Sequence, residues 1–405
     1  MMQLIPRPQY IDKIAGLINR GMILILVGQR RVGKSKILEL FREWLKCNRP
    51  DANVVYINKE YQAFRDIATA DQLYDYVAAR LPEGADNYLL VDEVQDIENY
   101  EIALRSFHAE GRCQVIATGS NAYIFSSELG TQLSGRYIEI KIYSLSYPEF
   151  LQFHNMADSD EALMHFLRVG GLPGLQAFRP EEVSQISDYM EGVYNTILIK
   201  DIVRRENIRN VTQLENVVRF VADNIGKPTS TINIARHMTS KGEKISGETV
   251  SNYLKYLNDA FLAIPIRRFD LHGKLLLESN NKNYFSDHGI RNYLCGYNLR
   301  GSIEKIMENV VWNHLRCQGL DVTVGILRAG EIDFIASRGD RRIYIQVTYL
   351  LASEETIRRE FGNLAAIKDN YPKYVVSLDP VAGEFSEYPG IEHINLRQFL
   401  KSALL

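Results

Sequence analysis

The chain has 405 residues, of which 46% are apolar and 24% charged, and a formal net charge of −3. This length leaves room for roughly two to four domains, and the composition is that of an ordinary globular protein. The net charge argues against a protein whose whole surface binds nucleic acid, although a local basic face remains compatible with it.

The four cysteines form no CxxC pair and have no flanking histidines, so they predict neither a zinc site nor a disulfide framework. The first residues, MMQLIPRPQYIDKI, lack the basic and apolar regions of a signal peptide. The apolar run Met22–Val27 is far too short to cross a bilayer. We therefore expect a cytoplasmic protein with no membrane partner.

The run Met22–Val27 leads into GQRRVGKS, which matches the P-loop pattern GxxxxGK[ST] in full and precedes a predicted helix over Lys34–Cys47. Two glycines let the backbone curl, so that successive N–H groups face phosphate oxygens. Lys34 would contact the β- and γ-phosphates, and the Ser35 hydroxyl would bind Mg²⁺. The predicted ATP-binding residues are Gly28, Gln29, Arg30, Arg31, Val32, Gly33, Lys34, Ser35 and Lys36.

Four more short apolar runs follow, separated by helical or polar stretches. Such alternation of strands and helices predicts an α/β fold with a parallel sheet sandwiched by helices. The runs are Val54–Ile57, Tyr88–Val91, Cys113–Ala117 and Tyr137–Ile142.

Two adjacent carboxylates follow the run Tyr88–Val91 directly. Open α/β sheets bind ligands at the carboxyl ends of their strands, so both carboxylates would lie beside the P-loop. Asp92 would hold the Mg²⁺ shell, and Glu93 would act as the general base for the attacking water.

Two further features lie near the ends of the predicted sheet. Thr118 and Ser120 follow the run Cys113–Ala117, and either hydroxyl would reach the γ-phosphate or the attacking water. Arg136, just before the last run, would neutralise transition-state charge, either in cis or in a neighbouring subunit of a homo-oligomer. A surface arginine in a turn is an equally good interpretation.

The middle of the chain is predicted to be helical over 146–210 and then to hold three short helices and a hairpin over 211–275. Between residues 200 and 274 the sequence has 13 Lys/Arg and 8 Asp/Glu, a local net charge of +5. A winged-helix module would direct Ser251, Asn252, Lys255 and the arginines Arg267 and Arg268 at duplex DNA. A module that packs against the ATPase domain or a protein partner explains the same pattern.

These motifs, in this order, resemble those of bacterial and archaeal AAA-type (ASCE) P-loop ATPases that carry a C-terminal domain of uncharacterised function. The resemblance rests on GQRRVGKS, VDEVQD, ATGSNA, LSGR with SLSYPEF, YNTILIKDIVRR and GEIDFIAS with IYIQV. It covers essentially the whole chain. It implies an ATPase core over 1–145, a helical region over 146–210, a winged-helix domain over 211–275 and a restriction-endonuclease-like domain over 276–405.

The C-terminal layout resembles the PD-(D/E)XK nuclease fold, with Glu308 on a helix and Asp333 on a strand. In that fold a further carboxylate and a lysine on the next strand complete the metal site. Here Gln346 and Thr348 stand at those two positions. We therefore expect a module with little or no nuclease activity that binds nucleic acid or a partner, or a plain structural domain.

Together these patterns predict an ATPase, dependent on ATP and Mg²⁺, that repositions its accessory domains on nucleic acid. The alternative is a signalling or scaffold ATPase whose accessory domains bind protein. An active nuclease with an unusual site is a third hypothesis.

Overall fold

The computed structural model describes residues 5–120, 135–299, 301–328, 330–380, 383–384 and 386–405. The chain divides into two compact units. The first comprises residues 1–143 with 259–261, and the second comprises 144–258 with 262–405.

The first unit is built on a five-stranded, fully parallel sheet with the strand order β2-β3-β4-β1-β5. The predicted α/β class and parallel sheet are therefore confirmed. The inner strand β1 is buried along its whole length because helices cover both faces of the sheet. The strands are β1 (Ile23–Val27), β2 (Asn53–Asn58), β3 (Asn87–Asp92), β4 (Gln114–Gly119) and β5 (Tyr137–Lys141).

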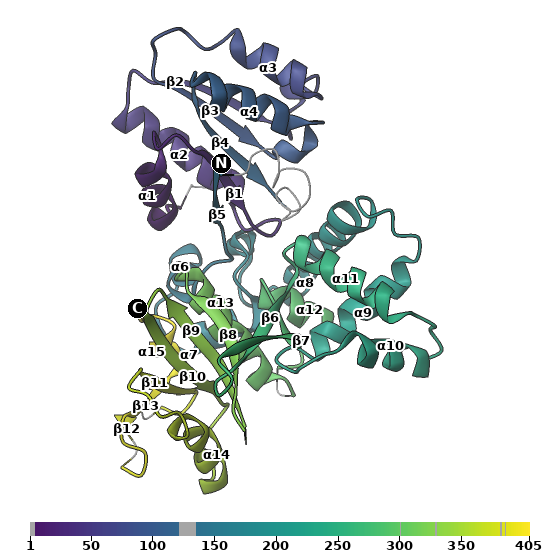
Figure 1. Cartoon of the computed structure of the whole chain (residues 1–405), viewed down its shortest axis with the longest axis vertical. Helices are drawn as coiled ribbons and strands as arrows, with labels where there is room; N and C mark the ends of the chain where they lie inside the picture. Colours follow the sequence, from purple (N-terminus) through teal and green to yellow (C-terminus); the bar gives the residue numbers. More distant parts are fainter. Residues whose placement is uncertain (1–4, 121–134, 300, 329, 381–382, 385) are drawn as a thin grey trace. The chain divides into compact units, whose positions relative to one another are not determined.

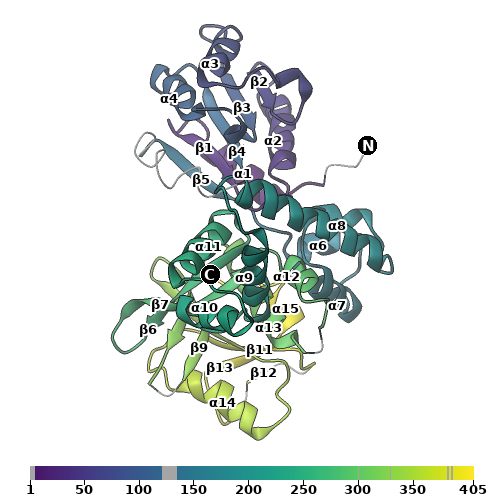
Figure 2. The ribbon, with the colours of Figure 1, turned by 90° about the vertical axis from the view of Figure 1, so that its right-hand side faces the viewer.

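Helices α3 and α4 pack on one face of this sheet, and Figures 1 and 2 show α1 and α2 on the other. Thr69 begins α3 with a capping box that it shares with Gln72, which satisfies the first free backbone N–H groups. The helices are α1 (Pro8–Leu17), α2 (Lys34–Asn48), α3 (Ala70–Ala78) and α4 (Tyr100–Glu110), with the short turns η1 (Gln62–Phe64) and η2 (Val94–Asp96).

The second unit begins with helices and ends in a mixed α/β region. A π-helical segment, η5, continues α8 directly, where the sequence predicts one long helix. The segments are α6 (Tyr147–Phe153), α7 (Asp160–Val169), η4 (Pro173–Ala177), α8 (Val183–Thr196), η5 (Ile197–Val203), α9 (Val211–Asp223), α10 (Thr231–Ser240), α11 (Gly247–Asp259), α12 (His288–Leu294), α13 (Ile303–Cys317), α14 (Glu354–Ala365) and α15 (Leu396–Phe399). No helix in the described ranges is long and apolar enough to cross a membrane.

An eight-stranded sheet organises the rest of the second unit, in the order β12-β13-β11-β10-β9-β8-β6-β7. Its strands are β6 (Ala263–Asp270), β7 (Leu275–Phe285), β8 (Asp321–Ile326), β9 (Glu331–Arg338), β10 (Arg341–Val347), β11 (Lys373–Ser377), β12 (Gly383–Glu384) and β13 (Ile391–Asn395).

The predicted wing hairpin exists as β6 and β7, but it is not a separate wing. Arg268 to Asp270 of β6 pair in parallel with Val324 to Ile326 of β8, which joins the hairpin to the C-terminal sheet. Strand β7 runs across the predicted boundary between residues 275 and 276. That boundary is therefore wrong, because a domain limit there would cut a hydrogen-bonded strand away from its sheet.

Candidate functional site

The P-loop connects β1 to α2 and requires glycine at two positions. Gly28 has a φ of +154°, and a Cβ there would lie 2.2 Å from the Ile142 carbonyl oxygen. Gly33 caps α2 with a φ of +99°. The chain therefore curls where a Cβ would clash, and the N-terminus of α2 follows this curl, where its first N–H groups would face a bound phosphate.

Two polar side chains of this loop are buried in an arrangement that fits a phosphate group. The Lys34 ammonium, only 4% exposed, donates to the carbonyl oxygens of Gly28 at 2.9 Å and Gln29 at 3.1 Å. Within the described parts of the chain, the buried Gln29 side-chain amide has no hydrogen-bond partner. An anionic ligand would pair with the buried cation and accept a hydrogen bond from the buried amide. These residues therefore fit the phosphates of ATP.

Asp92 ends β3 and is fully buried at the same edge of the sheet. Its two carboxylate oxygens accept hydrogen bonds from the Thr118 hydroxyl at 2.6 Å and the Asn58 amide at 3.0 Å. Burial raises the pKa of Asp92, whereas hydrogen bonds from Thr118 and Ser35 lower it. Since Ser35 opens α2, the P-loop and the acidic pair form one site.

Glu93 stands in a left-handed backbone conformation, with a φ of 55°, and is 6% exposed. Its backbone N–H donates to the Thr118 hydroxyl at 2.8 Å, and its carboxylate accepts a hydrogen bond from the Gln95 amide. That amide also contacts the Ser120 hydroxyl at 3.5 Å. Thr118 thus orients both acidic residues, whereas Ser120 lies beside the side chain that holds Glu93.

Arg136 lies at the opposite edge of the sheet from the P-loop. Its carbonyl oxygen accepts a hydrogen bond from the N–H of Ile23, the first residue of β1, whereas the P-loop follows the last residue, Val27. At about 3.3 Å per residue these ends are roughly 13 Å apart. The prediction that Arg136 acts in cis therefore does not fit the structure. A role in a neighbouring subunit stays a prediction.

Three site residues were missed from the sequence. Asn58 ends β2 beside Asp92, and the edge-of-sheet argument used for Asp92 would have found it. Gln95 holds Glu93. The buried Arg7 guanidinium donates to the carbonyl oxygens of Val32 in the P-loop and Tyr143, both at 3.1 Å, and no motif marks it.

A second polar cluster is buried in the C-terminal sheet around Lys282 of β7. Its ammonium lies 2.6 Å from Glu331, 3.5 Å from Asp333 and 3.8 Å from Glu308, and its side chain is 3% exposed. The Tyr284 hydroxyl donates to Glu308 at 2.7 Å. Burial raises the pKa of Glu308 to about 8 and that of Asp333 to about 6, while Lys282 lowers both.

This cluster places a cation beside Asp333 and Glu308, where the sequence predicts none. Gln346 and Thr348 do stand on or just after β10, and the Gln346 side chain accepts a hydrogen bond from the backbone of Asp333. The cation comes instead from Lys282, 51 residues before Asp333. No group of acidic, histidine or cysteine side chains among the described residues has a metal-binding arrangement.

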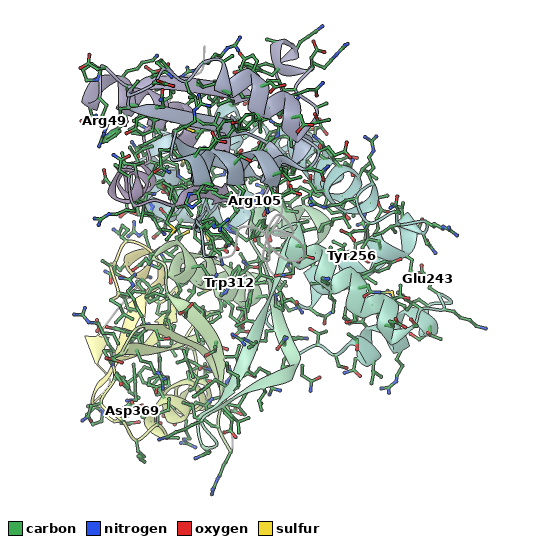
Figure 3. The ribbon with its side chains drawn as sticks, turned by 45° about the horizontal axis from the view of Figure 1, so that its top comes forward. Arg49, Arg105, Glu243, Tyr256, Trp312 and Asp369 are labelled. Carbon is green, nitrogen blue, oxygen red and sulfur yellow. The ribbon has the colours of Figure 1, made fainter. Side chains whose placement is uncertain are left out.

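Helices α9 to α11 form the predicted three-helix segment, and Figure 3 labels Glu243 before α11 and Tyr256 on it. The Ser246 hydroxyl accepts a hydrogen bond from the backbone N–H of Thr249 and caps α11. The side chains proposed to contact DNA, Ser251, Asn252, Lys255 and Arg267, are exposed, and Arg268 is partly buried.

Comparisons with known proteins match different parts of the chain. The model of an AAA domain matches residues 20–151, and that of a domain of unknown function matches residues 160–300. An uncharacterized protein of Haemophilus influenzae is 31% identical over 400 residues, covering 97% of both chains. One of Methanocaldococcus jannaschii is 28% identical over 384 residues, covering 89% of this chain and 83% of the relative.

Among solved structures, a Walker-type ATPase of Pyrococcus abyssi has a similar fold. Its TM-score is 0.50 at 16% identity, and the match covers 72% of this chain and 95% of that one. These comparisons support the P-loop ATPase assignment of the first unit. They give no support to the winged-helix and nuclease-like assignments of the second.

Proposed function

Because this chain belongs to the family of the Haemophilus influenzae protein that it matches end to end, and begins with an AAA-type P-loop ATPase domain, we propose that it is a Mg²⁺-dependent ATPase that moves its second unit on nucleic acid. One observation carries the proposal: the loop of Lys34 and Ser35 adjoins the buried acidic pair Asp92 and Glu93.

Each side chain has a separate task in this proposal. Lys34 neutralises the β- and γ-phosphates, and its hydrogen bonds to the loop carbonyls fix the position of the ammonium in the P-loop before ATP binds. Ser35 and Asp92 would hold Mg²⁺, which would neutralise charge at the transferring phosphoryl group. Glu93 takes the proton of the attacking water. Thr118 fixes Asp92 and Glu93 relative to one another.

Replacing Lys34 by alanine should weaken ATP binding about 10- to 100-fold, because a hydrogen-bonded charge at the phosphates is lost. Titration with a fluorescent ATP analogue measures this directly. The exposed Lys46, at the far end of α2, gives a matched control that should bind normally as alanine. Unchanged affinity of Lys34→Ala would remove the P-loop assignment.

We propose duplex DNA as the partner of α11 and the neighbouring arginines. The support is the exposed row Ser251, Asn252 and Lys255 on one helix, together with the local net charge of +5 over 200–274. A protein partner is the competing assignment. DNA-stimulated ATP turnover favours the first, and turnover that duplex DNA leaves unchanged favours the second.

Replacing Lys255 by alanine should weaken duplex binding and reduce the slope of log affinity against log salt by about 1, because one phosphate contact is lost. Fluorescence anisotropy at several salt concentrations measures the slope. Lys46→Ala, which lies on the first unit, serves as the control. If Lys255→Ala leaves the slope unchanged, α11 does not contact duplex phosphates and has another function.

For the C-terminal sheet we propose a binding module without nuclease activity. Gln346 offers only a neutral ligand at the position of the second carboxylate, and Lys282 is engaged by three carboxylates. Mg²⁺- or Mn²⁺-dependent plasmid cleavage that disappears in Asp333→Ala would overturn this assignment.

A further inference from the structure

A groove on the first unit lies along the edge strand β2, and the hydroxyl of its Tyr56 accepts a hydrogen bond at 3.2 Å from Asn58, the partner of Asp92. It has a volume of about 820 Å³, within the ~300–1,000 Å³ typical of ligand pockets. One wall comes from α2, the floor from β2 itself, and the other wall from η1 and α3. We call it the β2 groove; the side chains that matter below are Arg42, Tyr56, Tyr61, Phe64, Tyr76 and Arg80.

Flat, stacked side chains line this groove. The Arg42 guanidinium carbon lies 4.8 Å from the centre of the Tyr56 ring, and that of Arg80 lies 3.7 Å from the centre of the Tyr76 ring. Tyr61 lines the same groove and is 50% exposed, so part of its ring is accessible. Guanidinium and aromatic planes of this kind are surfaces on which nucleic-acid bases stack.

The groove carries a net positive charge. Among the described residues that line it, Glu39 carries the one carboxylate, which is paired with Lys36 at 2.8 Å. Arg42 approaches Glu43 only at 3.7 Å on the exposed surface, and Arg80 donates to the carbonyl oxygen of Tyr76 rather than to a carboxylate. Among the described residues, Arg80 therefore has no carboxylate partner, and the pair that Arg42 forms with Glu43 is exposed and weak enough for an anionic ligand to compete with it.

We propose that the β2 groove binds single-stranded nucleic acid, with bases stacked on Tyr61 and the Arg–Tyr pairs and phosphates held by Arg42 and Arg80. A duplex hides its base faces, and an acidic peptide offers charge without a row of flat rings, so neither uses both features of the groove. Binding there is independent of the proposed ATP hydrolysis. The groove nevertheless shares α2 with the P-loop and β2 with Asn58, the partner of Asp92.

The test uses the full chain without nucleotide and a fluorescent oligothymidylate of about 12 nucleotides, read by anisotropy. Tyr61→Ala should weaken binding about 5- to 100-fold, as expected for the loss of one stacked base, and Tyr61→Phe should retain it. Arg80→Ala should weaken binding and lower its salt dependence. Tyr371, 40% exposed on the second unit, provides the matched control Tyr371→Ala, which should bind normally.

Two results would overturn the proposal. One is equal loss of affinity in Tyr61→Ala and Tyr61→Phe, or no loss in either, because a stacking surface requires the ring alone. The other is that a poly-glutamate peptide binds as tightly as the oligonucleotide and that Tyr61→Ala does not weaken its binding. The groove would then be a site for acidic protein segments that recognises charge alone. The assay contains neither ATP nor duplex DNA, so failure here is separate from failure of the proposed ATPase activity and of the duplex assignment.

Discussion

Replacing Glu93 by glutamine should leave ATP binding intact and lower ATP turnover by about 10²- to 10⁴-fold, the usual contribution of a positioned general base. Glutamine keeps the size of the side chain and a hydrogen bond with Gln95, but it cannot take a proton from water. The P-loop, Ser35 and Asp92 are untouched, so the nucleotide should still bind. Phosphate release at saturating ATP measures turnover, and a fluorescent ATP analogue measures affinity.

A matched control lies five residues away, in the same connection. Glu98 is exposed, so Glu98→Gln makes the same chemical change without touching the site and should turn over ATP normally. If Glu93→Gln keeps normal turnover, Glu93 is not the base. If it loses ATP affinity as well, Glu93 contributes to binding or folding rather than to proton transfer.

The sequence predicts the nucleotide site well because its determinants are short-range. The P-loop pattern lies within eight residues, and the acidic pair directly follows an apolar run that must be a buried strand. Once those runs are aligned in a parallel sheet, their carboxyl ends meet, and this places Thr118 beside Asp92. The same reasoning applied to β2 finds Asn58.

The sequence does not predict residue positions that depend on pairing between strands far apart in the chain. Arg136 precedes a strand rather than following one, so the parallel arrangement moves it to the wrong edge for its own nucleotide. Lys282 reaches the carboxylates only because the β6–β7 hairpin joins the C-terminal sheet through β8. No local pattern marks that pairing, since a hairpin with basic residues is equally typical of a wing.

Replacing Lys282 by methionine should lower the free energy of unfolding by about 3–5 kcal/mol near neutral pH, because it leaves buried carboxylates without their cation. Methionine keeps the volume and the unbranched stem, so the change isolates the charge. Urea denaturation followed by circular dichroism measures the difference. Lys274→Met, an exposed lysine just before β7, is the control and should change stability by less than about 0.5 kcal/mol.

The pH dependence of this loss distinguishes an electrostatic role from simple packing. The pKa values of Asp333 and Glu308, about 6 and about 8 in the folded chain, lie above their ordinary values of 3.8 and 4.5. Between about pH 4 and pH 8 the folded chain therefore binds more protons than the unfolded chain, and these two groups reduce stability as pH rises. Lys282 opposes this by lowering both pKa values.

The difference in the free energy of unfolding between wild type and Lys282→Met should consequently be small near pH 5 and grow towards pH 8. A difference that stays constant across this range would mean that Lys282 stabilises the sheet by packing alone.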